Sequence, residues 1–301
     1  MKISVVLNTL NCQEGLARAL KSVQKLADEI VVCDDGSIDR TIEIAKEFNA
    51  KIFHHKSAGY VEPARNYAIE RAQEPWILIL DCDEEVPPSL AGKLKELATG
   101  EKRSQIDYVL IPRKNIIFGK WIRHTGWWPD YNIRFFKKGK VSFSDKIHEE
   151  PMAQGREWKL SDKESYAIIH HNYQTIGQFL ERMNRYTDIE AKGLVSSGYK
   201  FSWLDLLKKS DGEFLSRFFA REGYKDGLHG FILATLQSFS IFLTYLKGWE
   251  LGGQKEQEIE LKDLKKEMLS GLREFKFWLF DSLSKGERGI KRLTYKFFQK
   301  L

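Results

Sequence analysis

Two carboxylates, Asp81 and Asp83, stand one residue apart directly after a short apolar run. The run, Trp76-Ile-Leu-Ile-Leu80, is typical of a buried strand, so both acids are expected at a strand end. Hard cations such as Mg²⁺ or Mn²⁺ accept carboxylate oxygens together with substrate phosphates. The same spacing also suits the start of a solvated loop, but the apolar run in front of it favours a divalent metal site.

A second acidic pair, Asp34 and Asp35, follows the run Glu29-Ile-Val-Val-Cys33. The residues after this pair are typical of a turn and a helix start, in which Ser37 or Asp39 caps the helix. Capping does not explain two adjacent carboxylates at a strand end. One of them is therefore expected to hydrogen-bond a base or a ribose.

The first hundred residues predict the scaffold that positions these acids. Apolar strands are predicted over 3–7, 29–33, 51–54 and 76–80, and helices over 14–27, 40–48 and 62–73. Continuously apolar strands separated by helices indicate a doubly wound α/β domain whose parallel sheet is covered on both faces. The polar residues after the strands then meet at one rim, where such sheets bind ligands. His54 and His55 follow the third strand, and we interpret them as surface or sheet-edge residues.

Beyond residue 100 the pattern changes. Short strands are predicted over 108–112, 133–136 and 141–143, around an aromatic-rich segment at 118–130, and from Gln174 onward the pattern is mainly helical. We place a domain boundary near residue 200, which gives the parts 1–200 and 201–301. Residues 228–246 are apolar nearly all round, but His229 and Gln237 interrupt the run, so a membrane-spanning helix is not expected.

Composition limits the classes of protein. The 42% hydrophobic content excludes a disordered chain, and the 30% charged content excludes a multispanning membrane protein. Three cysteines without C-x-x-C spacing form neither a disulfide framework nor a zinc knuckle, which indicates a reducing, cytoplasmic location. The net charge is +6, and residues 271–301 alone hold eight basic against three acidic residues. The remainder is close to neutral, so nucleic acid is not an expected partner.

The basic segment 271–301 also contains seven aromatic side chains. A basic amphipathic helix with aromatic residues can lie at the surface of an anionic membrane. The alternative is a packing or oligomer helix whose lysines face solvent. We favour a peripheral position on the inner face of the plasma membrane.

The motifs together resemble the inverting glycosyltransferases of family 2, which have the GT-A fold. Four segments carry the resemblance in the family's order: ISVVLNTLNCQEGLARALKSV, EIVVCDDGSIDRT, ARNYAIERA and WILILDCDEEV. Three later segments resemble the subgroup that contains lipopolysaccharide core beta-1,4-glucosyltransferases: GKWIRHTGWWPDYNIRFF, DKIHEEP and QFLERMNRYTDIEA. The resemblance covers roughly residues 1–245. It implies an α/β GT-A domain followed by a largely helical C-terminal extension.

The resemblance also implies a reaction. A nucleotide-sugar donor, most often a UDP-sugar, binds with its diphosphate on a divalent metal, Mn²⁺ or Mg²⁺. A carboxylate deprotonates an acceptor hydroxyl, which attacks the anomeric carbon and inverts it. The acceptor is a cell-envelope glycan or a lipid-linked molecule. By the resemblance, the donor-binding residues are Asn8, Thr9, Asn11, Asp34, Asp35, Arg65, Asp81 and Asp83.

Among these residues, Asp83 is the main metal ligand and Asp81 contacts the ribose or the metal. The resemblance places the base well after the D-x-D motif, at Glu149 or, in competition, at Asp130, which is otherwise a turn residue or an acceptor-positioning residue. A further metal ligand is expected at His170, with His171 behind it, although a histidine at a strand end is more often structural.

The acceptor site is expected around the aromatic segment. Trp127 and Trp128 stack on sugar rings or pack in the core, and both interpretations stay open. Arg134 holds an acceptor phosphate or carboxylate, or it lies on a solvated rim.

Two other functions compete with this one. A polyprenyl-phosphate sugar synthase shares the early motifs but not the later segments. A catalytically inert sugar- or nucleotide-binding module would be expected to have lost a metal carboxylate, and Asp35, Asp81 and Asp83 are all present.

Overall fold

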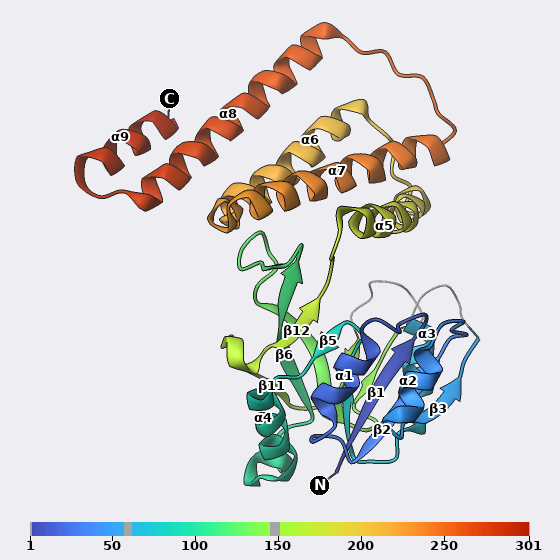
Figure 1. Ribbon diagram of the computed structural model, residues 1–301. Helices are drawn as coiled ribbons and strands as arrows, with labels where there is room; N and C mark the ends of the chain where they lie inside the picture. The colour runs from blue at the N-terminus through green and yellow to red at the C-terminus, as the bar shows by residue number, and fades with distance from the viewer. Residues whose placement is uncertain (1, 57–61, 145–150, 301) are drawn as a thin grey trace. The chain divides into compact units, whose positions relative to one another are not determined.

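The computed structural model describes residues 2–56, 62–144 and 151–300 (Figure 1). The chain divides into two compact units. The first consists of residues 1–116 and 129–172, and the second consists of residues 117–128 and 173–301. The predicted division near residue 200 stays a prediction.

The first half of the first unit is a parallel sheet. Its strands are β1 (Ile3–Thr9), β2 (Glu29–Asp34), β3 (Lys51–His54) and β4 (Trp76–Ile79), and the helices between them are α1 (Leu16–Val23), α2 (Thr41–Glu47) and α3 (Glu62–Arg71). The four strands pair in parallel in the order β3-β2-β1-β4. The predicted alternation of strands and helices, and the parallel order, are confirmed for this half.

Beyond β4 the sheet becomes mixed. The further elements are β5 (Glu84–Glu85), α4 (Pro88–Thr99), η1 (Glu101–Gln105), β6 (Tyr108–Ile117), β8 (Asp130–Lys137), β11 (Glu157–Lys159), η2 (Glu164–Tyr166) and β12 (Ile168–His171). The order continues β4-β8-β6-β12-β5, in which β8 is antiparallel to both of its neighbours. β9 (Val141–Ser142) and β10 (Met152–Ala153) form a separate two-stranded sheet. The doubly wound parallel sheet predicted from the sequence is therefore one half of a larger mixed sheet.

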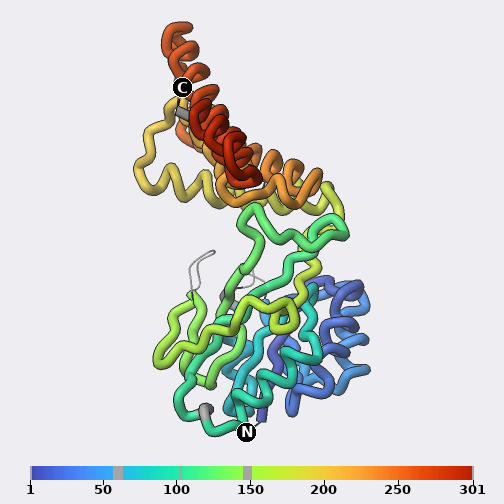
Figure 2. The backbone as a smooth tube through the Cα atoms, turned by 90° about the vertical axis from the view of Figure 1, so that its left-hand side faces the viewer, coloured from blue at the N-terminus to red at the C-terminus, as the bar shows by residue number. Residues whose placement is uncertain are grey.

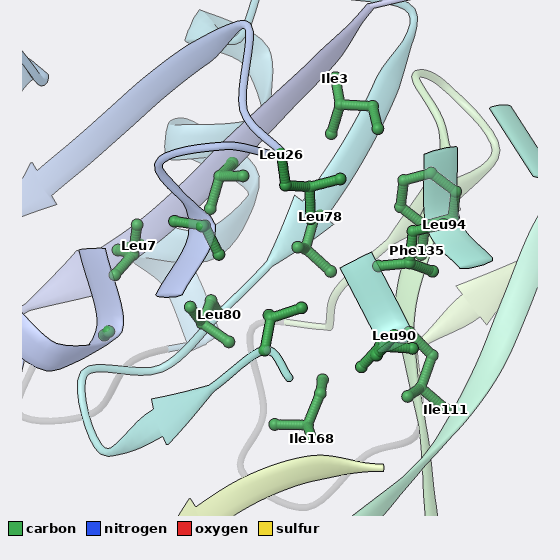
Figure 3. Close-up of a cluster of buried hydrophobic side chains, with 14 of the residues drawn as sticks. Ile3, Leu7, Leu26, Leu78, Leu80, Leu90, Leu94, Ile111, Phe135 and Ile168 are labelled. Atoms are coloured by element: carbon green, nitrogen blue, oxygen red, sulfur yellow. The ribbon is translucent and has the colours of Figure 1, made fainter. Parts of the chain in front are cut away.

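Helices cover both faces of the sheet because successive strand residues point to opposite sides. On one face, Leu7 and Leu78 pack with side chains of α1, α2 and α4, such as Leu90 (Figure 3). On the other face, Val6 and Ile77 pack against α3. The core therefore fixes the direction of β1 and β4, whose ends carry the acidic residues.

The second unit is largely helical, as predicted. Its elements are β7 (Lys120–Trp121), α5 (Ile176–Ser196), α6 (Trp203–Leu215), η3 (Ser216–Ala220), η4 (Gly223–Asp226), α7 (Leu228–Leu251), α8 (Leu261–Gly286) and α9 (Gly289–Lys300). Its core joins Ile122 of the 117–128 segment to Phe179 on α5 and Leu233 on α7. After α8 the chain turns back, so that α9 lies beside α8 (Figures 1 and 2).

α7 is the apolar helix of this unit. Among the described residues it is long and apolar enough, by length and composition only, to cross a membrane. It packs on α5 and α6, and 22% of its apolar window is buried. The expectation that residues 228–246 do not span a membrane stays a prediction.

Candidate functional site

Three strand ends meet at one rim of the sheet in the first unit. Thr9 at the end of β1 is in register with Asp34 at the end of β2, and the backbone N–H of Asp35 donates to the Thr9 carbonyl at 2.9 Å. The segment after β4 reaches the same place, because the Cys82 thiol donates to the Asn8 carbonyl at 3.5 Å. The residues that follow β1, β2 and β4 are therefore neighbours, as the sequence predicts.

Asp34 organises the loop after β2. Its Oδ1 accepts from the hydroxyls of Thr9 at 2.9 Å and Ser37 at 2.5 Å. Its Oδ2 accepts from the backbone N–H groups of Gly36 and Ser37 at 3.0 and 2.9 Å. Because these four bonds occupy both oxygens of a side chain that is 1% exposed, Asp34 acts on a ligand through the loop that it shapes.

Asp35 has a closer titratable partner than Asp34, whose Oδ2 lies 4.0 Å from His54 Nδ1. Asp35 Oδ1 lies 3.3 Å from His55 Nδ1, and the His55 ring lies 5.1 Å from the ring of Tyr67. Burial raises the pKa of Asp35, and the facing His55 partly offsets this rise. His55 is thus part of the rim, and its interpretation as a surface or sheet-edge residue was incomplete. The available signal was its position directly after β3, whose last residues are in register with the end of β2.

The two asparagines of the β1–α1 loop differ in their bonding. Asn11, at φ 52°, accepts the Ile38 N–H through Oδ1 at 2.9 Å and so joins the loops after β1 and β2. Asn8 Nδ2 is buried and has no hydrogen-bond partner within the described part of the chain. A buried donor without a partner is a group that a bound ligand can satisfy.

Arginines surround Asp81. Arg65 Nη2 donates to its Oδ1 at 3.1 Å, and Arg134 Nη2 donates to its Oδ2 at 2.5 Å. Burial alone would raise the pKa of Asp81, but Arg134 and Arg65 outweigh it and hold this pKa well below its usual range. Arg134 is 4% exposed and also donates to Glu84, which is completely buried, at 2.7 Å. The structure therefore places Arg134, predicted as an acceptor residue, against the carboxylates of the D-x-D segment.

Asp83 lies beside a histidine of β12. β12 runs antiparallel to β5 with His170 opposite Glu84, which brings His170 Nε2 to 3.6 Å from Asp83 Oδ2. His171, the next residue, points the other way, as strand residues alternate. Its Nε2 is 2.5 Å from Glu85 Oε1. Of the two histidines predicted near the metal, His170 is the one that faces Asp83.

Hydrogen bonds define the tautomer of His170. The Asn115 amide donates through Nδ2 to Asp130 Oδ2 at 3.1 Å, so its Oδ1 is the acceptor that faces His170 Nδ1 at 2.7 Å. In the neutral ring the proton therefore belongs on Nδ1, and the lone pair of Nε2 points toward Asp83. An imidazole nitrogen and a carboxylate oxygen in this arrangement suit a divalent transition metal such as Mn²⁺.

The donor set is small. Among the described residues, no group of three or more His, Cys, Asp or Glu side chains could hold a metal ion. Asp83 and His170 therefore fit a metal that takes its remaining ligands from substrate phosphates and water, as Mg²⁺ and Mn²⁺ do in phosphate sites. Asp81, predicted as a second ligand, has both oxygens in ion pairs with arginines.

Asp130, one of the two candidate bases, begins β8. Arg113 on β6 donates to Asp130 Oδ2 through Nε at 2.9 Å, and Asn132 Nδ2 donates to Oδ1 at 3.1 Å. Arg113 Nη1 also lies 3.5 Å from Glu84 Oε1, so ion pairs connect Asp130 to the D-x-D segment. Glu149, the other candidate, lies outside the described residues.

Sequence reasoning missed Arg113 and Asn115. Both lie on β6 and pair with carboxylates or histidines far along the chain. The predicted strand ended at residue 112, whereas β6 continues to Ile117, so both residues lie past the predicted end and alternation along that strand could not indicate them.

The tryptophans predicted to bind acceptor belong to the second unit. The ring of Trp127 is 6.4 Å from that of Tyr173, and Trp127 packs against the core of this unit. Trp128 meets Trp121 edge to face at 5.3 Å. Their role in acceptor binding stays a prediction.

The chain is similar to several known proteins. Residues 4–153 match the family model described as glycosyl transferase family 2. An uncharacterised glycosyltransferase of Rickettsia typhi is 28% identical over 259 residues, which cover 83% of this chain and 87% of that protein. The lipopolysaccharide core biosynthesis glycosyltransferase LpsC of Rhizobium meliloti is 24% identical over 259 residues, 82% and 92% of the two chains. The crystal structure of S. aureus TarS residues 1–349 is similar with a TM-score of 0.43 and 18% identity, covering 82% of this chain and 92% of that one.

Proposed function

This chain belongs to glycosyl transferase family 2 and is a glycosyltransferase, and from that premise we propose that it is a metal-dependent, inverting enzyme. It moves a sugar from a nucleotide-sugar donor, a UDP-sugar by our prediction, to a cell-envelope glycan or lipid-linked acceptor. The observation that carries the proposal is the pairing of Asp83 Oδ2 with His170 Nε2 at 3.6 Å, on the rim that also holds Asp35.

The donor nucleotide occupies the rim formed by the loops after β1 and β2. The unpartnered amide of Asn8 donates to an acceptor atom of the nucleotide, and Asp35 accepts from a base N–H or a ribose hydroxyl. Thr9, Asn11 and Asp34 contribute by holding these loops in place. A ligand atom that accepts from this buried donor removes the free-energy cost of leaving it without a hydrogen bond.

The diphosphate lies next to the D-x-D segment. Asp83 and His170 would hold the metal, and a bound Mn²⁺ or Mg²⁺ would neutralise charge on the leaving diphosphate. Asp81 and Arg134 fix this segment through their ion pair, and Arg65 adds positive charge on the same side. These side chains therefore keep Asp83 in one position while the donor binds.

A carboxylate accepts the proton of the attacking acceptor hydroxyl, which lies on the face of the sugar opposite the diphosphate. Glu149 and Asp130 remain the two candidates. Asp130 is held by Arg113, Asn115 and Asn132, a fixed position that suits either a base or a group that orients the acceptor.

The acceptor belongs to the cell envelope by analogy. LpsC, whose name places it in lipopolysaccharide core biosynthesis, is similar along 82% of this chain. Trp127 and Trp128 offer ring faces of the kind that stack on sugars. A lipid-linked or lipid-anchored acceptor would also explain a basic, aromatic C-terminal segment.

A peripheral membrane position is the second part of the proposal. On α9, Ile290, Leu293 and Phe297 are 82%, 67% and 61% exposed and are spaced to share one face of the helix. Lys291, Arg292 and the other cations of the segment lie among them. An exposed apolar face flanked by cations is typical of a helix that lies on an anionic membrane surface.

The test of the proposed reaction is nucleotide release from a panel of UDP-, GDP-, dTDP- and CMP-sugars, each with Mn²⁺, Mg²⁺ or EDTA. We expect slow hydrolysis of one donor that stops in EDTA. Asp83→Ala should abolish it without loss of the folded state, whereas Lys93→Ala, at a partly exposed position on α4 that pairs with Glu96, should leave it unchanged. Donor turnover that is equal in EDTA and in Mn²⁺ contradicts the metal assignment.

A further inference from the structure

Asn115 lies between His170, a proposed metal ligand, and Asp130, a candidate base. It lies on β6 with no exposed surface. Its Oδ1 faces His170 Nδ1 at 2.7 Å, and its Nδ2 donates to Asp130 Oδ2 at 3.1 Å. His170 in turn lies 3.6 Å from Asp83. One amide thus stands between the candidate metal ligands and a candidate base.

The orientation of this amide has chemical consequences. A buried amide has a distinct acceptor end and donor end. Only the orientation with Nδ2 toward the Asp130 carboxylate places an N–H donor against an acceptor, because a carboxylate cannot donate. The other end must then accept from His170 Nδ1–H, so the neutral ring carries its proton on Nδ1 and directs the Nε2 lone pair at Asp83. Metal-binding histidines in proteins are commonly oriented by such a second hydrogen bond.

We infer that Asn115 is a positioning residue that sets the His170 tautomer for metal binding and holds Asp130 in the same network. The inference rests on the proposed function. It adds a residue that touches neither metal nor substrate, and it predicts that the two tasks can be separated by mutation.

The first experiment reads the tautomer directly. In the full-length, metal-free chain labelled with ¹⁵N-histidine, long-range ¹H–¹⁵N NMR reports which ring nitrogen carries the proton. His170→Gln identifies the His170 signals by their loss. We expect the Nδ1–H tautomer in the wild-type chain. An Nε2–H tautomer for His170 overturns the inference without any variant of Asn115.

The second experiment measures Mn²⁺ affinity from the free-ion signal in electron paramagnetic resonance. Asn115→Leu removes both bonds, and removal of such an orienting partner weakens metal binding by about 10- to 100-fold. Asn115→Asp can still accept from His170, but it places a second carboxyl group against Asp130, and the two carboxyl groups then share a proton. The variant should therefore keep the Nδ1–H tautomer and most of the affinity while kcat falls. Asn132→Ala is the matched control. The Asn132 amide donates to Asp130 Oδ1, whereas Asn115 bonds to Asp130 Oδ2 and His170 Nδ1, so the variant removes a bond to Asp130 and keeps the bond to His170. It should leave Mn²⁺ affinity unchanged.

The outcomes separate the inference from the proposed function. A wild-type chain that binds no Mn²⁺, or an Asp83→Ala chain that binds it equally well, overturns the metal-dependent function, while the NMR experiment still decides the amide orientation. A folded Asn115→Leu chain with wild-type Mn²⁺ affinity overturns the role of Asn115 alone. If Asn115→Leu fails to fold, loss of the Nδ1–H tautomer in Asn115→Asp overturns it.

Discussion

At the scale of single residues, the two acids of one motif have different surroundings. Asp81 is enclosed by Arg65 and Arg134, whereas Asp83 faces His170. Two residues of the same type, two positions apart, therefore have different partners. Asp81 is held by two arginines, and Asp83 is the acid that we propose as the metal ligand. The sequence indicates the pair of acids but not this division, because the arginines come from positions far along the chain.

Replacing Asp81 is expected to act on stability. Asp81→Asn leaves Arg134 paired with Glu84, and the Asp81 side chain is 28% exposed, so we expect the free energy of unfolding to fall by about 1–3 kcal/mol. Urea unfolding at neutral pH measures this loss. Asp83→Ala is the matched variant, since it removes the neighbouring acid of the motif and keeps the ion pairs of Arg134 with Asp81 and Glu84. Equal stability of Asp81→Asn and wild type contradicts this assignment.

The same residue predicts a pH dependence. Since the pKa of Asp81 is lower in the folded than in the unfolded chain, its contribution is present above the unfolded value of about 3.9 and is lost as the pH falls below it. The difference in unfolding free energy between wild type and Asp81→Asn should therefore shrink as the pH falls from about 6 toward about 3. Urea unfolding across this range checks the sign. A difference that grows toward acid contradicts it.

The identity of the base also belongs to this scale. Glu149→Gln should keep donor binding but lose transfer if Glu149 is the base, because the amide cannot accept the proton of the acceptor hydroxyl. Asp130→Asn tests the competitor in the same way. Donor affinity by calorimetry separates loss of chemistry from loss of binding. Loss of transfer in Asp130→Asn alone would assign the base to Asp130.

At the scale of elements, the sequence predicted the strands and helices whose formation depends on residues close together in the chain. The strands 3–7, 29–33 and 76–80 each carry a continuous apolar run, and their parallel pairing follows from the helices between them. The insertion of β8 between β4 and β6 was not predictable in this way, because strand pairing across 50 residues leaves no local pattern. The polar network on β6 depends on that pairing. For this reason Asp130 was recognised from its motif while its partners Arg113 and Asn115 were not.

The contact between the β1–α1 loop and the D-x-D segment gives a test at this scale. A Cβ on Gly15 would lie 2.5 Å from the Cys82 carbonyl oxygen, a backbone atom that cannot rotate away. Gly15→Ala should therefore push the two segments apart, destabilise the fold by about 1–3 kcal/mol and raise the KM for the donor. Thermal unfolding and donor kinetics measure both effects.

Gly92 provides the control for this substitution. It lies within α4, and no atom comes within 4 Å of a Cβ at that position. Gly92→Ala should leave donor kinetics unchanged and stabilise the helix by about 1 kcal/mol. If the two alanine variants behave alike, the close approach at Gly15 does not constrain the site.

At the scale of the whole molecule, the distribution of charge matters more than its sum. The net charge is +6, and the segment 271–301 holds eight basic and three acidic residues, a net +5. Composition predicted this asymmetry, and its combination with exposed apolar side chains on α8 and α9 is what the structure adds. Leu272 on α8 is 63% exposed, and Phe297 on α9 is 61% exposed. Exposing these apolar side chains to water is unfavourable. An anionic membrane would bury them and attract the basic side chains beside them.

Membrane binding can therefore be tested on the full-length chain with two substitutions of one kind. Phe297→Asp places a charge on the exposed apolar face of α9, and it should reduce co-sedimentation with vesicles that contain anionic lipid. Met152→Asp, at a residue of the first unit that is 66% exposed, is the matched control and should leave it unchanged. Binding should also fall as salt rises, because the screening length shortens from about 10 Å at 0.1 M to about 3 Å at 1 M. Binding to neutral vesicles that is as strong as binding to anionic ones, or equal loss in both variants, would assign the exposed face of α9 to protein packing instead.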